Sequence, residues 1–193
     1  KTESSELTLG FKKGEPVSLN GTPFTDPVKL INELESIAAP YGIGRDIHTG
    51  ETIIGIKGRV GFQAAAARLL IDAHYSLEKH VLTKWQQHWK EQLGNWYGMF
   101  VHEAQFTEPV MRDIEKFLEH SQRYVTGEVY LSLHPHYFRV KGIRSDHDLM
   151  NPKFARYGEE NLSWSAADVK GFTRIMSNAS RIFYSVNQEE KPS

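Results

Sequence analysis

One stretch of the chain, residues 41–59 (YGIGRDIHTGETIIGIKGR), combines charged side chains with several glycines. The carboxylates of Asp46 and Glu51 could accept hydrogen bonds from an amine or from a ureido N–H group. The cationic groups of Lys57 and Arg59 could hold a carboxylate. Glycine lets the backbone turn tightly and approach a ligand closely. The stretch is therefore either a loop that binds a small polar ligand or an ordinary hairpin with surface ion pairs.

The glycines of this stretch do not form a nucleotide-binding motif. Gly42 and Gly44 follow an expected helix instead of a strand, and a third glycine at the spacing of the dinucleotide fingerprint is missing. The sequence also contains no GxxxxGK[ST] loop. The 193 residues thus offer no loop of the kind that cradles phosphates.

The histidines give no metal-binding pattern. His134 and His136 would share one face of a continuous strand and could hold a metal there, but Pro135 between them favours a hairpin turn. Histidines on the expected helices are spaced by six and eight residues, whereas a helical metal pair needs a spacing of four. These are His74, His80 and His88. We predict no metal site.

A second segment with acid–base groups is SDHD at residues 145–148. Neighbouring positions in the sequence do not establish the geometry of a catalytic triad, and serine and aspartate are common in turns and caps, so a catalytic role and a turn role both stay open. The chain has no cysteine, which excludes disulfides, thiolate metal sites and a cysteine nucleophile. We assign no catalytic residue.

Composition bounds the class of protein. A chain of 193 residues with 39% hydrophobic and 24% charged residues suits one globular domain, or one and a half. A net charge of -1 gives no electrostatic footprint for nucleic acid or an anionic membrane, and no apolar run approaches the roughly 18 residues of a membrane span. We expect a cytoplasmic protein. Because the chain begins at Lys1 without a methionine, we also expect a fragment.

The pattern of apolar residues and turn signals predicts an α+β fold with small antiparallel sheets of hairpins, a helical block and a long C-terminal helix. Thr25 or Asp26 is the expected cap of the first helix, with Pro27 in its first turn. In chain order, the expected elements are two strands within residues 6–21 with turns at Gly14 and Asn20-Gly21, a helix up to Pro40, and a strand pair joined near Gly50. Helices are expected over residues 64–82, 84–103 and 108–122, where the second continues the first and a break near Gly94 or Gly98 is allowed. A hairpin over 124–145 that turns near Pro135, a loop over 145–164 and a helix over 165–188 follow.

Five segments resemble one enzyme family. GIGRDIHTGETIIGIKGRVGF is similar to the segment that argininosuccinate synthases usually write as GxGRxDIVENRFxGMKSRGxYE. FKKGEPVSLNG, LINELESIAAPYGIGR, VTGEVYLSL and ADVKGFTRI resemble further family segments in the same order. Several motifs in the right order over about 170 residues are more specific than any one of them.

This resemblance implies a ligase that joins citrulline to aspartate and releases AMP and pyrophosphate. ATP would adenylate the ureido oxygen of citrulline, and the α-amine of aspartate would then displace AMP. The family's N-terminal nucleotide-binding domain has no counterpart in this sequence. ATP and magnesium are therefore expected only for the full-length enzyme, with neither bound by this chain, which would be inactive alone. The family also forms homotetramers in which the C-terminal helix reaches neighbouring subunits.

The resemblance also implies site residues. A count back from GIKGR places Gly50 at the position of the family's citrulline-binding glutamate, and a slip of one residue in the turn would place Glu51 there. We expect Glu51 to accept hydrogen bonds from the α-ammonium group of citrulline. The citrulline-contacting tyrosine of the family falls at Phe62, which keeps the ring but has no hydroxyl. The residues expected to support the loop are Arg45, Lys57 and Arg59.

Four segments follow from this interpretation. Residues 1–5 form a disordered lead-in, 6–164 the citrulline-side part of the synthetase domain, 165–188 an oligomerisation helix and 189–193 a tail. The last helix carries more apolar residues than one face of a monomer needs, which favours subunit contact. Two alternatives stay open: an oligomerisation module without ligand binding, and an unrelated α+β domain that binds a small ligand.

Overall fold

The computed structural model describes residues 1–153 and 163–187 of the chain. They form an α+β fold with small antiparallel sheets, as the sequence predicts. The chain divides into two compact units, Lys1–Leu149 and Met150–Ser193. Among the described residues, no helix is both long and apolar enough to cross a membrane.

The first unit is built on a five-stranded antiparallel sheet in the order β3-β2-β1-β6-β7. Its strands are β1 (Ser5–Lys12), β2 (Glu15–Leu19), β3 (Thr22–Pro23), β6 (Gly127–His134) and β7 (Tyr137–Arg144). The predicted turns at Gly14, Gly21 and Pro135 are confirmed, and β1 begins at Ser5. β1 pairs with β6, more than a hundred residues away, from Ser5↔Leu133 to Phe11↔Gly127. This pairing brings both ends of the unit into one core.

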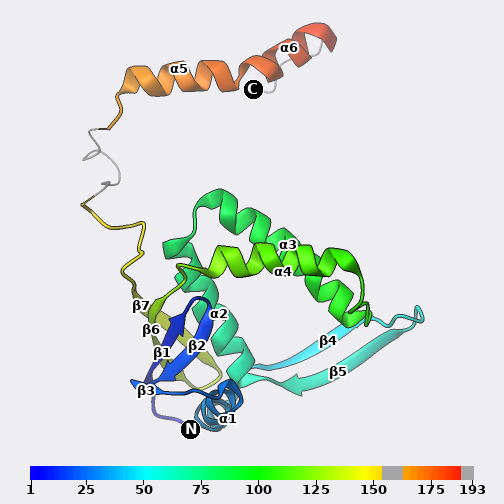
Figure 1. The fold of residues 1–193 in the computed structure, drawn as a ribbon, viewed down its shortest axis with the longest axis vertical. Coiled ribbons are helices and arrows are strands. Elements are labelled where there is room, and N and C mark those ends of the chain that lie inside the picture. The colour runs from blue at the N-terminus through cyan, green and yellow to red at the C-terminus, as the bar shows by residue number, and fades with distance from the viewer. Residues whose placement is uncertain (154–162, 188–193) are drawn as a thin grey trace. The chain divides into compact units, whose positions relative to one another are not determined.

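Two helices and a short 3-10 turn pack on this sheet (Figure 1). They are α1 (Pro27–Ala38), η1 (Ala39–Tyr41) and α2 (Ala65–Val81). Asp26 caps α1 by accepting a hydrogen bond from the Val28 backbone N–H at 2.9 Å, and Pro27 follows at the first helical position. Residues spaced by three or four positions on the two helices, among them Leu34, Leu69, Ala73 and Leu77, are fully buried against strand residues such as Leu9 and Leu131.

Helices α3 (Lys84–His102) and α4 (Pro109–Gln122) lie side by side in Figure 1. The sequence allowed a break in this region at Gly94 or Gly98, but α3 runs through both glycines. The chain breaks earlier, at Leu82, because Thr83 and Gln86 form a capping box that starts a new helix. No residue of α3 is fully buried, so this helix depends on its few side-chain contacts with α2 and α4.

A buried polar cluster joins α2, α3 and α4. The Glu78 carboxylate is 2% exposed and accepts hydrogen bonds from Lys90 Nζ at 2.9 Å and from Gln122 Nε2 at 2.7 Å. The ring of His74 lies one turn before Glu78, with Nδ1 3.8 Å from the carboxylate and Nε2 2.9 Å from Gln122 Oε1. Each of the three helices thus contributes to one network, which fixes their arrangement.

We expect His74 to make the stability of the first unit depend on pH. Burial is the largest effect on this ring and lowers the pKa of His74 below its ordinary value of 6.5, with Lys90 acting in the same direction and Glu78 and Glu15 opposing it. The unfolded chain then binds the proton more readily, so the contribution is complete above the unfolded pKa and is lost as the pH falls below it.

Urea unfolding of the wild-type chain and of His74→Gln, at about pH 7.5 and about pH 5.5, measures this contribution. The wild-type chain should lose more stability on acidification than the variant, which keeps a polar partner for Gln122 but does not titrate. Equal losses in the two proteins would contradict the expectation.

The second unit contains α5 (Ala166–Met176) and α6 (Asn178–Asn187). Ser165 begins α5 with a capping box, and the hydrogen bonds that it gives Asp168 lower the pKa of that carboxyl. The long C-terminal helix expected over 165–188 is present but bent, since the structure divides it at Ser177 into α5 and α6. Gln188 and the predicted tail 189–193 lie outside the described residues, as does part of the predicted 145–164 loop. Large apolar side chains of both helices are exposed, including Phe172, Ile175, Met176 and Val186.

Candidate functional site

The charged, glycine-containing stretch forms a hairpin of its own. β4 (Arg45–Glu51) and β5 (Lys57–Gln63) pair as a separate two-stranded sheet, and Figure 1 shows them extending away from α1 and α2. The turn was predicted near Gly50, and this was wrong: Gly50 pairs with Gly58 inside the ladder, and the turn comprises residues 52–56. Thr52 closes it by three hydrogen bonds with Ile56, and Gly55 has φ +77°. The isoleucines of the turn are exposed.

The ladder assigns each hairpin residue to one of two faces. Pairing runs from Arg45↔Gln63 to Glu51↔Lys57 without a bulge, so side chains alternate strictly and opposed residues share a face. The Phe62 face carries Asp46, His48, Gly50, Gly58, Val60 and Phe62. The Glu51 face carries Arg45, Ile47, Thr49, Glu51, Lys57, Arg59, Gly61 and Gln63.

Glu51 and Phe62, the two residues expected to contact citrulline, are not brought together. They lie on opposite faces, and Phe62 stands opposite Asp46, five positions before Glu51, which corresponds to about 17 Å of strand. Glu51 instead forms an ion pair with Lys57 at 3.2 Å, in which both side chains are largely exposed. Such a pair stabilises the hairpin only slightly.

Arg45 and Gln63 fasten the base of the hairpin to the rest of the unit. Arg45 Nε donates to Gln63 Oε1 at 3.0 Å, and Gln63 Nε2 donates to the Ala39 carbonyl at 2.9 Å. Arg45 thus reaches the rest of the unit through Gln63, and its expected role in supporting a citrulline-binding loop stays a prediction. Arg59 lies farther along the hairpin, opposite Thr49.

The backbone at the hairpin base needs glycine. Gly44 has φ +71°, and a Cβ atom there would lie 2.6 Å from the carbonyl oxygen of Ala64, whose own N–H donates to the Gly44 carbonyl at 3.0 Å. Gly42 has φ +72°, and the space beside it holds the ring of His136. These two glycines allow the start of β4, the start of α2 and the β6–β7 turn to meet closely.

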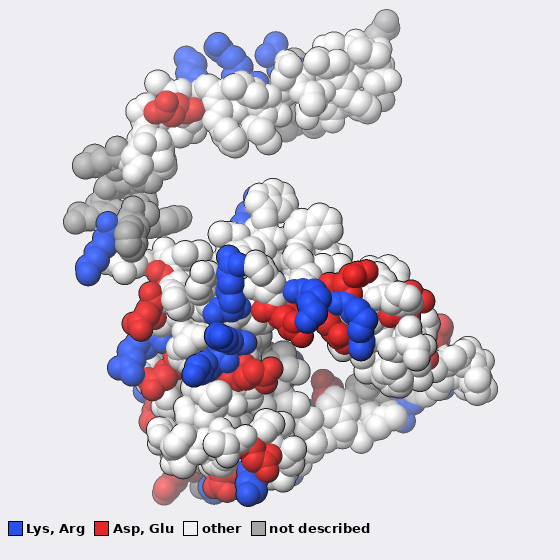
Figure 2. Space-filling view, in the orientation of Figure 1, with Lys and Arg blue, Asp and Glu red and all other residues white. Residues whose placement is uncertain are grey.

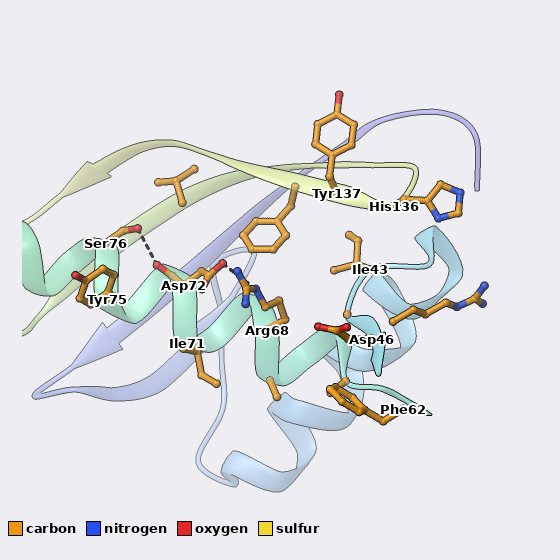
Figure 3. A pocket seen from close by; sticks show the side chains of 16 residues that line it. Ile43, Asp46, Phe62, Arg68, Ile71, Asp72, Tyr75, Ser76, His136 and Tyr137 are labelled. Atoms are coloured by element: carbon orange, nitrogen blue, oxygen red, sulfur yellow. Dashed lines mark hydrogen bonds and ion pairs between the residues drawn. The ribbon is translucent and has the colours of Figure 1, made fainter. Parts of the chain in front are cut away.

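A groove of about 920 Å³ opens where these segments meet (Figure 3). The hairpin contributes Asp46 and Phe62, and α2 contributes Arg68 and Asp72, whose side chains form an ion pair at 3.0 Å. Its aromatic residues are Phe62, Tyr75, Tyr137 and Phe138. The groove thus combines carboxylates, guanidinium groups and apolar walls, which suits a small molecule with charges of both signs and an aliphatic body.

Nearer the hairpin tip, His48 fills the space above Gly50. A Cβ atom at Gly50 would lie 2.6 Å from His48 Nε2, so the imidazole occupies the room of the absent side chain. A smaller cavity of about 420 Å³ adjoins this position and is lined by His48, Val60 and His102 from α3. Figure 2 shows an opening between the hairpin and the pair α3 and α4. The sequence analysis did not single out His48. The signal that could have found it is its position two residues before a glycine in a strand, because the two positions share a face.

The other polar candidates have structural contacts. The His134 ring stacks on Tyr137 with centroids 4.7 Å apart, and His136 has φ +69° in the turn. In the part of the chain that the structure describes, no cluster of three histidine, cysteine or acidic residues could hold a metal. In the SDHD segment, Ser145 donates to the Thr126 carbonyl and Asp148 pairs with His80 at 3.2 Å. These contacts fit the turn role.

Sequence comparison decides the family. The model of the arginosuccinate synthase C-terminal domain matches residues 1–183 of the chain. The chain belongs to this family.

Curated relatives named argininosuccinate synthase agree with this assignment. The protein of Xanthomonas axonopodis is 36% identical over 187 residues, which cover 97% of this chain and 45% of the relative. The protein of Crocosphaera subtropica is 33% identical over 92% of this chain and 44% of the relative. For Pyrococcus furiosus the identity is 34%, over 93% of this chain and 43% of the relative. The chain therefore spans less than half the length of these relatives.

Given the family, the hairpin register bears on which residues take the positions of the family's citrulline-binding glutamate and tyrosine. Positions 50 and 62, which align with the glutamate and tyrosine of the argininosuccinate synthase pattern, share the Phe62 face. The slip that would give Glu51 the role of that glutamate would need a bulge in β4, and the ladder is regular there. The contact between Glu51 and citrulline stays a prediction that binding measurements must test.

Proposed function

We propose that this chain is the C-terminal part of an ATP-dependent ligase of arginine biosynthesis, which joins citrulline to aspartate and releases AMP and pyrophosphate. The observation that carries this proposal is the family match over residues 1–183. The names of the relatives support it. A cytoplasmic location, as for other enzymes of amino-acid biosynthesis, is part of the proposal.

The chain's share of the reaction is to hold and orient the amino-acid substrate. The groove at the hairpin base lies open and combines polar with apolar lining. Aligning two reactants lowers the barrier without an acid–base relay, as do charges placed where charge develops. The sequence contains no glycine-rich phosphate loop. We therefore place the nucleotide on another part of the full-length protein, and propose that this chain alone is inactive.

The test is an assay of the full-length protein that contains this chain, with citrulline, aspartate and ATP. Argininosuccinate should form, and pyrophosphate release should require citrulline. The chain of residues 1–193 alone serves as the control and should release none. Absence of argininosuccinate from a folded full-length protein that binds ATP would overturn the proposed activity.

Subunit assembly is a second function favoured by a separate observation. Ile175 and Phe172 of α5 are 75% and 63% exposed, and Trp85 of α3 is 63% exposed. Large apolar side chains at this exposure favour burial against another subunit. We propose a homo-oligomer, a tetramer as in the family. Light scattering of the wild-type chain and of Phe172→Asp tests this: the variant should dissociate, and a wild-type monomer at high concentration would contradict it.

A further inference from the structure

The register of the hairpin determines which carboxylate can share a small ligand with Phe62. Asp46 and Phe62 are directly opposed in the β4–β5 ladder, and opposed residues in an antiparallel pair have Cβ atoms about 5 Å apart on one face. Both residues line the groove at the hairpin base, and Figure 3 shows them in it. A molecule the size of an amino acid could therefore touch both side chains. Glu51 is on the other face and does not line this groove.

The carboxylate of Asp46 has capacity for a further donor. Its Oδ1 accepts one hydrogen bond, from the neighbouring Ile47 N–H at 2.7 Å. Among the described residues, no lysine, arginine or histidine forms an ion pair with it, whereas the carboxylate of Glu51 is engaged by Lys57. An ionised carboxylate has about four acceptor positions. A ligand ammonium group can thus bind Asp46 without displacing a protein cation.

The rest of the groove complements the remainder of an amino acid. Arg68 uses its Nε in the pair with Asp72 at 3.0 Å, and a guanidinium has further N–H groups that can hold a ligand carboxylate. Ile71, Phe62 and Tyr75 give apolar surface for an aliphatic chain. The groove therefore offers a carboxylate, a guanidinium and apolar walls to one ligand.

We propose that Asp46, and not Glu51, accepts hydrogen bonds from the α-ammonium group of the amino-acid substrate, with Arg68 on its α-carboxylate. This inference rests on the proposed function and names the site of one of its substrates. Asp46 positions the substrate and takes no proton from it. His48, beside Asp46 on the same face, lies over Gly50 and limits the site toward the hairpin tip.

Calorimetric titration of the full-length protein with L-citrulline, and with 5-ureidopentanoate, which lacks the α-amino group, tests the inference. Asp46→Asn should weaken citrulline binding by roughly 10- to 100-fold, the loss expected for one charge-assisted hydrogen bond. Binding of 5-ureidopentanoate should be unchanged, since that molecule has no ammonium group. Arg68→Gln should weaken both ligands, since both carry the carboxylate.

Glu119→Gln is the matched control, because Glu119 is a largely exposed carboxylate of α4 that does not line the groove; it should leave citrulline affinity unchanged. Glu51→Gln tests the competing ligand, a carboxylate on the other face of the same hairpin. If Glu51→Gln weakens citrulline binding and Asp46→Asn does not, the Asp46 assignment is wrong and Glu51 is the ligand. Binding of citrulline that neither variant changes overturns the Asp46 assignment but leaves the proposed ligase intact. A wild-type protein that binds no citrulline overturns both.

Discussion

Replacement of Glu78 by alanine is expected to lower the free energy of unfolding of the first unit by about 3 kcal/mol. The carboxylate is 2% exposed and binds Lys90 of α3 and Gln122 of α4 at 2.9 and 2.7 Å. Without it, Gln122 Nε2 loses its shorter hydrogen bond and keeps the one to Ser121 Oγ at 3.2 Å, and Lys90 loses its counter-ion in a partly buried position. We place the loss at the lower end of that for buried pairs because Lys90 is 28% exposed and can reach water. Urea unfolding followed by tryptophan fluorescence measures it, since α3 carries three tryptophans.

The control for Glu78 is Glu119 on α4, which pairs with Lys116 at 2.7 Å while both side chains are largely exposed. Glu119→Ala removes an ion pair of similar length without burial, and the unfolding midpoint should hardly move. Glu78→Gln keeps the shape of the side chain and one acceptor oxygen, so its stability should lie between those of Glu78→Ala and Glu119→Ala. If Glu78→Ala is as stable as Glu119→Ala, the cluster does not hold the three helices together.

Local chemistry made much of the fold predictable. Asp26 with Pro27 starts α1, Gly14 and Gly21 mark turns, and Pro135 marks the β6–β7 turn, each by a preference that acts within a few residues. The position of the break between α2 and α3 was harder to predict from the sequence. Glycines at positions 94 and 98 were the stronger local signal, but the helix tolerates them, and the break lies at the Thr83 capping box.

The faces of the hairpin were not predictable from composition. The turn was expected at Gly50, which would have placed Glu51 in it; the structure places the turn at residues 52–56 instead. Because side chains alternate with a period of two, an error of one residue exchanges the faces. The sequence therefore allowed Glu51 and Phe62 to contact one ligand together, whereas the β4–β5 register places them on opposite faces.

The groove could not be predicted from the sequence, for a different reason. Asp46 and Arg68 come from the hairpin and from α2, which follows it, whereas His136 lies more than sixty residues later, and only the packing of the hairpin base and the β6–β7 turn beside α2 brings the three together. Asp46 and Phe62 were named as candidates from the glycine-containing stretch, and the local trace on α2 was the spacing of Arg68 and Asp72, which is that of a helical ion pair. Such a spacing is equally common on solvated helix faces, so it could not single out a binding site.

Gly44→Ala is expected to destabilise the first unit by about 2–4 kcal/mol and to loosen the hairpin base. The residue has φ +71°, which costs a non-glycine residue about 1 kcal/mol. A Cβ atom would also lie 2.6 to 2.8 Å from backbone atoms of Ala64 and Ala65, which begin α2 and cannot move away cheaply. Unfolding in urea gives the stability, and faster hydrogen exchange at the Ala64 amide, which donates to Gly44 at 3.0 Å, reports the loosened base.

Variants of two other hairpin glycines separate the cost of the positive φ from the cost of the steric contact. Gly55 has φ +77° but nothing within 4 Å of its Cβ position, so Gly55→Ala should show the backbone cost alone. Gly61 has no positive φ and the same open space, so Gly61→Ala should be neutral or slightly stabilising. The free energy of unfolding that Gly44→Ala loses beyond the loss in Gly55→Ala then measures the close approach of β4 to α2, which shapes the groove. If the two variants are equally stable, the hairpin base yields to the added methyl group, and Gly44 is required only for its backbone angle.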